Sequence, residues 1–119
     1  FDYTVLSHTL QAVRDVDHLI MEMLRVSQKS IVSFPNFAYY KLRRMLAEEG
    51  RAPRSTNLLR YEWYNSPNIR FFSIVDFEDF CRDRNIRIHE CIALDTEEER
   101  IVAENPNLMA DMVIFVISR

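Results

Sequence analysis

The sequence predicts an α/β protein, in which helices pack against a sheet. Segments with strand patterns alternate with segments whose apolar residues recur at helical spacing, and this alternation is typical of folds that contain parallel strands. Hydrophobic residues make up 48% of the 119 residues, which is enough for a core and argues against disorder of the whole chain. This length fits one domain.

The first half of the chain alternates between strand and helix patterns. Residues 1–7 are β-branched and aromatic and predict a buried strand, and residues 30–34 predict a second one. Between them, Asp15 is expected to cap a helix with helical spacing of apolar residues. A further helix is expected from Ala38 to Glu49, and Gly50 stands where a helix stop belongs.

The second half is predicted to hold a loop, a helix and two strands. Residues 51–69 contain turn formers without a clear period and predict a long loop. Ser73 with Asp76 forms a capping box that opens the next helix. Ile86 to Leu94 alternates apolar and polar residues, which is typical of a strand with one wet face, and Met112 to Ile117 predicts a last apolar strand.

Two further expectations concern the helices and the connection before the last strand. Thr96 with Glu99 predicts a short acidic helix or turn, which Asn105-Pro106-Asn107 is expected to break. We assign the helical stripes to the core and give them no function. These stripes are Leu19, Ile20, Met23 and Leu24, then Leu42, Met45 and Leu46, then Phe77, Phe80 and Cys81.

Glycine and cysteine content exclude several kinds of site. Gly50 is the only glycine, and backbone cradles for phosphates or dinucleotides need several, so a complete nucleotide site of that kind is excluded. Cys81, Cys91 and His89 lack the close paired spacing of zinc ligands, so no metal site is predicted. Two cysteines are too few for a disulfide framework, which favours a reducing cytoplasm.

Charge is segregated along the chain although the net charge is only −3. The stretch from Lys41 to Arg60 is rich in basic residues, which is compatible with nucleic acid or an anionic ligand. A solvated helix face plus loop is favoured instead, because the domain as a whole is not basic. The sequence has no apolar run of about 18 residues, so no membrane span is predicted, and Phe1-Asp2-Tyr3 does not resemble a signal peptide.

Four segments carry a family resemblance. They are Leu-Ser-His-Thr-Leu-Gln-Ala-Val at 6–13, Glu-Met-Leu-Arg-Val at 22–26, Phe-Pro-Asn-Phe at 34–37 and Tyr-Glu-Trp-Tyr-Asn-Ser-Pro-Asn-Ile at 61–69. In this order and at about this spacing, they make the chain from residue 1 to residue 119 resemble the methionine biosynthesis protein MetW family. The last two segments are the most specific, since ordinary methyltransferases lack both.

This resemblance implies the C-terminal half of a class I S-adenosylmethionine-dependent methyltransferase fold, which is Rossmann-like. We therefore expect a mixed sheet with a terminal antiparallel hairpin, made of residues 86–94 and 112–117, in a single partial domain over residues 1–119. The family's N-terminal part, with its glycine-rich cofactor loop and acidic ribose-binding residue, is not in the sequence, and Phe1 looks like the edge of a truncation. S-adenosylmethionine is implied for the full-length family and is not expected for this chain alone.

The sequence departs from the family at two places. The family usually has Gln where His8 stands, and it often has Gly-His-Trp where Ala38-Tyr39-Tyr40 stands. The resemblance places Ser7, His8 and Thr9 beside the cofactor's methionyl group, where open α/β sheets bind ligands. His8 is either a lining residue or general base, or a polar residue in a turn. The turn is favoured because no carboxylate or nucleophile is placed to orient His8, and no catalytic residue is assigned.

Asn36 and Phe37 follow the second strand at the same edge of the sheet. An amide both donates and accepts hydrogen bonds, so Asn36 is suited to a ligand or methyl acceptor. It is equally suited to organising the turn before the helix. The two alternatives carry equal weight at this point.

Aromatic residues gather in the long loop. Tyr61, Trp63 and Tyr64, followed by Asn68, form the candidate partner-binding segment, because Tyr and Trp dominate binding hot spots. The alternative is that these rings fold back as a lid over the core. The sequence does not decide between the two.

The resemblance implies a methyltransferase-fold accessory protein of methionine biosynthesis, acting with homoserine O-acyltransferase in the cytoplasm. The alternative is an S-adenosylmethionine-dependent methyltransferase, with the loops after Ser7 and Phe34 lining the acceptor site. A nucleic-acid-binding module using Lys41 to Arg60 is a weaker third hypothesis. Residues 1–7 would form an exposed strand edge without the N-terminal half, so self-association through this edge is also expected.

Overall fold

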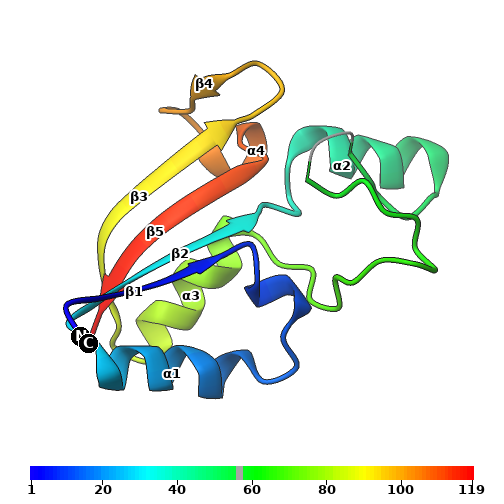
Figure 1. The fold of residues 1–119 in the computed structure, drawn as a ribbon. Helices are drawn as coiled ribbons and strands as arrows, with labels where there is room; N and C mark the ends of the chain where they lie inside the picture. Colours follow the sequence, from blue (N-terminus) through cyan, green and yellow to red (C-terminus); the bar gives the residue numbers. More distant parts are fainter. Residues whose placement is uncertain (56–57) are drawn as a thin grey trace.

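The computed structural model describes residues 1–55 and 58–119, and its strands form one mixed sheet (Figure 1). The order across the sheet is β1-β2-β5-β3-β4. Strands β1 and β2 are parallel, whereas β5 is antiparallel to both of its neighbours, so the predicted parallel start and antiparallel hairpin are confirmed. The strands are β1 Tyr3–Ser7, β2 Lys29–Pro35, β3 Arg87–Asp95, β4 Arg100–Ile101 and β5 Met112–Ser118.

The two main helices begin at the caps that the sequence predicts. The carboxylate of Asp15 accepts a hydrogen bond from the backbone N–H of His18 at 3.0 Å and opens α1. Ser73 and Asp76 form a reciprocal capping box at the start of α3. The helical segments are η1 Leu10–Ala12, α1 Val16–Val26, α2 Tyr40–Arg44, η2 Met45–Glu49, α3 Ile74–Asp83 and α4 Pro106–Met109.

Helices α1 and α3 pack on the same face of the sheet and enclose the main core with it. The ring of Phe34 is at its centre, with ring centroids 4.5 Å from Phe72, 5.2 Å from Phe77 and 5.9 Å from Phe115. Five apolar side chains of β2 and β5 that point to this covered face are fully buried. They are Val32, Phe34, Val113, Phe115 and Ile117.

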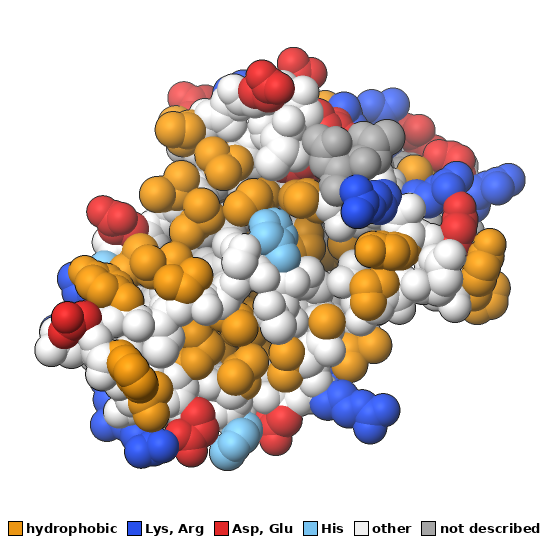
Figure 2. Space-filling view, viewed as in Figure 1, with side chains coloured by type: hydrophobic (Ala, Val, Ile, Leu, Met, Phe, Trp, Pro, Cys, Tyr) orange, Lys and Arg blue, Asp and Glu red, His pale blue; other side chains and the backbone are white. Residues whose placement is uncertain are grey.

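The opposite face of the sheet is also apolar, but it is open to solvent. Val5, Ile31 and Val116 are register partners across three strands on this face. Val5 is 68% exposed, so no helix of the described residues covers it. Hydrophobic side chains accordingly reach the surface over the strands (Figure 2).

Two predictions about strand burial are wrong. Residues 1–7 were expected to form a buried strand, but β1 is an edge strand with alternate side chains exposed. The strand expected to have one wet face is exposed on both faces from Arg87 to Ile92. The first part of β3 is also a second edge of the sheet, because the paired residues between β3 and β4 are Leu94 with Ile101 and Asp95 with Arg100.

Two predictions about helices also need correction. The expected helix from Ala38 to Glu49 begins at Tyr40 and widens into the π-helical turn η2, which Gly50 ends in the left-handed conformation. A π turn changes the angular position of later side chains, so Leu42 is buried whereas Leu46, assigned to the core, is 55% exposed.

Pro106 begins α4 instead of breaking a helix. It occupies a first-turn position, where proline's missing N–H costs no hydrogen bond. None of the helices in the described part of the chain is long and apolar enough to cross a membrane.

Candidate functional site

The loop after β1 is organised by its own polar groups. His8 has a φ of 51°, and its backbone N–H donates to the carbonyl of Ser33 at 2.9 Å. The hydroxyl of Thr9 donates to the carbonyl of Ser7 at 2.9 Å, and the hydroxyls of Ser7 and Ser33 are 3.3 Å apart. The His8 imidazole makes no hydrogen bond or ion pair with a described residue, so none of these residues orients it as a base. This geometry favours the turn interpretation of His8.

Gln11 joins this loop to the end of the long loop, which sequence reasoning missed. Its side-chain N–H donates to the carbonyl of His8 at 2.8 Å. Its backbone carbonyl accepts from Ile69 at 2.7 Å and from Arg70 at 2.8 Å. The side-chain oxygen of Gln11 is buried without a hydrogen-bond partner among the described residues.

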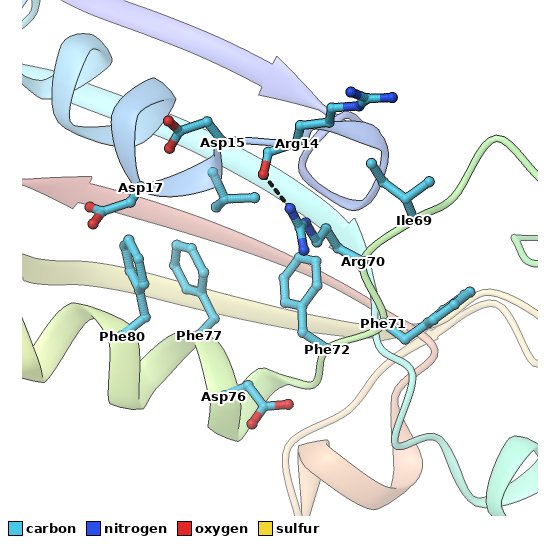
Figure 3. A pocket seen from close by; sticks show the side chains of 11 residues that line it. Arg14, Asp15, Asp17, Ile69, Arg70, Phe71, Phe72, Asp76, Phe77 and Phe80 are labelled. Carbon is cyan, nitrogen blue, oxygen red and sulfur yellow. Dashed lines mark hydrogen bonds between the residues drawn. The ribbon is translucent and has the colours of Figure 1, made fainter.

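These residues do not by themselves fit S-adenosylmethionine. Gly50 caps η2, and the backbone around Ser7 to Thr9 is held by internal hydrogen bonds. A cavity of about 600 Å³ between α1 and α3 (Figure 3) is lined by other residues, none of them from this loop. We therefore derive no chemical step through the cofactor.

Asn36 is fully buried, and its amide is used entirely by the protein. The amide N–H groups donate to the carbonyls of Asn107 and Ala110 at 2.9 and 2.8 Å. The amide oxygen accepts from the backbone N–H groups of Ala38 and Ile74 at 3.3 and 3.2 Å. No group is left for a ligand, so the structure favours the turn-organising alternative over the acceptor-binding one.

Phe37 belongs to an aromatic cluster beside the sheet edge. Its ring centroid is 4.7 Å from that of Phe71, and it packs against the small core of Tyr39, Leu42 and Leu59. A cavity of about 240 Å³ adjoins this cluster. Its lining brings together several residues that the sequence singled out, namely Phe37, Tyr61, Trp63 and Asn68.

The aromatic loop, which we define as residues 61–69, presents the rings of Trp63 and Tyr64 to solvent. Trp63 and Tyr64 are 78% and 69% exposed, and their rings meet edge to face with centroids 5.6 Å apart. Leu59, which precedes this segment in the long loop, is buried in the small core. The rings of Trp63 and Tyr64 therefore do not form a lid over the core, and the lid alternative is wrong for these two residues.

The basic stretch is largely neutralised by neighbouring acids. Lys41 pairs with Glu97, and Arg54 pairs with Glu62. Further pairs with longer N–O distances are Arg44 with Glu48 at 3.6 Å and Arg51 with Glu49 at 4.0 Å. Such pairing argues against a free cationic surface for nucleic acid.

A buried polar cluster fixes α2 to the turn between β3 and β4. The Tyr39 hydroxyl donates to the carboxylates of Asp95 and Glu97 at 3.4 and 3.3 Å. Burial and the charges of these two carboxylates raise the pKa of Tyr39 far above its ordinary value. The Asp95 carboxylate also accepts from the backbone N–H groups of Glu97 and Glu98. No local sequence pattern marks this cluster, because Tyr39 is far along the chain from Asp95 and Glu97.

The cysteines offer no evidence of reactive chemistry. Cys81 is buried on α3, and burial raises the pKa of its thiol to about 11, in line with an inert core residue. Cys91 is exposed on β3, and both thiols are free. Among the described residues no group of three or more His, Cys, Asp or Glu side chains is arranged to hold a metal ion.

The sheet order and the antiparallel β5 define the class of protein, a partial Rossmann-like methyltransferase fold. A solved structure supports this class. The small RNA methyltransferase HEN1 superposes with a TM-score of 0.61, covering 99% of this chain and 14% of that one. At 14% sequence identity, this likeness shows the fold alone.

Sequence comparison identifies the family within this class. The family model for methionine biosynthesis protein MetW matches residues 1–117, so the chain belongs to the MetW family. A similar curated protein is the bifunctional methionine biosynthesis protein MetXA/MetW of Rhodopirellula baltica, 42% identical over 121 residues. All of this chain aligns with it, and the chain spans 19% of that relative's length.

Proposed function

We propose that this chain is part of a methyltransferase-fold accessory protein that binds homoserine O-acyltransferase in methionine biosynthesis. The observation that carries the proposal is the MetXA/MetW relative, in whose name both functions are joined in one protein. Two proteins that act together are often fused in some relatives, so the fused relative supports a partnership between the separate proteins. We expect this partnership to operate in the cytoplasm.

The aromatic loop supports a binding role. Tyr61, Trp63 and Tyr64 are exposed, large and rigid, and such residues supply much of the energy of protein interfaces. Asn68 adds an amide at the lining of the adjoining cavity. We therefore assign Tyr61, Trp63, Tyr64 and Asn68 to the acyltransferase interface.

The test is a titration of the chain with homoserine O-acyltransferase from the same genome. Changing Trp63 and Tyr64 together to Ala should weaken binding by ~2–4 kcal/mol, in the hot-spot range. The melting temperature should change little, because both side chains are exposed. A large loss of thermal stability with unchanged affinity would contradict this assignment.

A methyltransferase activity is the alternative function, favoured by the fold likeness to HEN1. In this hypothesis the loop of Ser7, His8 and Thr9 lies beside the cofactor, and Phe37 lies on the acceptor side. The full-length protein should then consume S-adenosylmethionine when it meets the right acceptor. If the protein is only an accessory protein, it should not consume S-adenosylmethionine when acyltransferase and homoserine are added to it.

We also propose that this chain alone does not bind S-adenosylmethionine appreciably. The chain has a single glycine, and Gly50 serves as a helix stop. Titration calorimetry of the 119-residue chain measures this directly. Low-micromolar binding would contradict the proposal.

Self-association through β1 is a further part of the proposal. This edge strand presents an unpaired row of backbone groups together with exposed Tyr3 and Val5. Two copies pairing edges about a two-fold axis would satisfy these groups and close the assembly. Light scattering should find a dimer or larger species, and a clean monomer at tens of micromolar would contradict it.

A further inference from the structure

A groove separate from the aromatic loop's small cavity lies between α1, α3 and the segment 69–72 (Figure 3). Its volume is about 600 Å³, within the usual range for binding pockets. The rings of Phe72, Phe77 and Phe80 lie along its α3 side (Figure 3). The groove can therefore accept apolar side chains.

The carboxylates around the groove already have partners. Asp15 caps α1, and Asp76 belongs to the capping box of α3. Asp17 accepts from two nitrogens of Arg84 at 3.0 and 3.2 Å, and this pairing holds the pKa of Asp17 below its ordinary value. These acids are used in holding the helices.

Two arginines of the groove have no carboxylate partner among the described residues. Arg70 donates to the backbone carbonyls of Val13 and Arg14 and forms no ion pair with a described residue. The exposed side chain of Arg14 likewise has no carboxylate partner in the described part of the chain. Both arginines lie at the end near Ile69, away from Phe80 (Figure 3). The groove thus combines an apolar wall with positive charge at one end.

The same end is continuous with the proposed acyltransferase interface. Phe71 is 58% exposed and lines both the groove and the cavity beside Trp63. Ile69 is also exposed and ends the aromatic loop segment. The surface around Trp63 and the groove are therefore continuous through Phe71, and one partner can cover both.

We propose that this groove docks a segment of the acyltransferase that carries apolar side chains followed by a carboxylate. The apolar side chains fill the space beside Phe72 and Phe77, and the carboxylate lies against Arg14 and Arg70. At the end near Ile69 the two arginines favour an acidic segment, because a basic one would place like charges together. The inference rests on the proposed partnership and adds a second contact region to it.

The experiment measures acyltransferase affinity for two groove variants and two matched controls. Ile69→Ser removes an exposed apolar side chain of the groove. Arg14→Glu reverses an exposed charge that has no ion pair with a described residue. Val75→Ser is the apolar control, because Val75 is 44% exposed on α3 but does not line the groove. Arg87→Glu is the charge control, since Arg87 is exposed on β3 without an ion pair to a described residue.

Each groove variant should raise Kd about tenfold or more, whereas the controls should stay within about twofold. The affinity loss of Arg14→Glu should shrink as salt is added. Unchanged affinity of both groove variants for the acyltransferase would overturn this inference. If the Trp63 and Tyr64 double variant then still loses affinity for the acyltransferase, the proposed function stands. Failure of the unaltered chain to bind the acyltransferase would overturn both.

Discussion

The two faces of the sheet have similar composition and opposite environments. On the face covered by α1 and α3, the side chains of Phe34 and Phe115 are completely buried. On the opposite face, the side chains of Val5 and Ile101 are largely exposed. Strand β5 is apolar at successive positions, a pattern typical of sheets with cover on both faces. The difference teaches that apolar residues in a strand create a surface suited to burial. Whether this surface is buried depends on the helices that pack against it.

The largest effect should come from the centre of the covered face. Phe115→Ala removes a ring that contacts those of Phe34 and Phe77, and it should cost about 3–5 kcal/mol of unfolding free energy. Denaturant titration measures this cost. A loss below about 1 kcal/mol would break the contrast between the faces, because it would mean that the core readily collapses around the change.

A matched pair on β5 sharpens the contrast with less drastic changes. Val113 points to the covered face and is fully buried, while Val116 points to the open face and is only partly buried. Val113→Ala should cost about 2 kcal/mol, and Val116→Ala should cost less than about 1 kcal/mol. Equal losses of unfolding free energy would indicate that something covers the open face in solution.

The smallest expected effect is a pH dependence of a buried polar group. The pKa of Tyr39 is raised in the folded chain, so its contribution is fully present below the ordinary tyrosine value near 10 and is lost as pH rises above it. Lys41, whose pKa is raised by its bond to Glu97, acts in the same direction. Unfolding free energy measured between pH 9 and 11 should therefore fall less steeply in Tyr39→Phe. An identical slope in both proteins would contradict this role for the hydroxyl.

Sequence patterns predicted what depends on neighbours along the chain. The caps at Asp15 and Ser73 are set by residues three positions away, and both helices begin where those signals stand. The sheet class followed from the alternation of strands and helices. The local pattern of residues 1–7 wrongly predicted a buried strand, because an apolar strand has the same pattern at an edge as in the middle of a sheet. The edge position of β1, which was expected from the family resemblance, is confirmed.

Site residues were harder to predict because their partners are distant in sequence. Asn36 bonds to carbonyls at Asn107 and Ala110, and no local pattern around Asn36 marks these contacts. The groove likewise draws its walls from two stretches far apart in sequence, within residues 14–17 and 69–80. In the aromatic loop, a local concentration of Tyr and Trp drew attention to Trp63 and Tyr64, which the structure places at the surface, and their partner-binding role stays a prediction.

The position of β5 in the sheet has a consequence for how the chain folds. The strand between β2 and β3 comes from residues 112–118, after all the others in sequence. Until these residues are available, β1 can pair with β2, and β3 can pair with β4. No strand pairing joins these two pairs of strands to each other without β5. Pairings of such long sequence separation close large loops and slow folding. During synthesis the edges of β2 and β3 that pair with β5 therefore stay open until residues 112–118 are available.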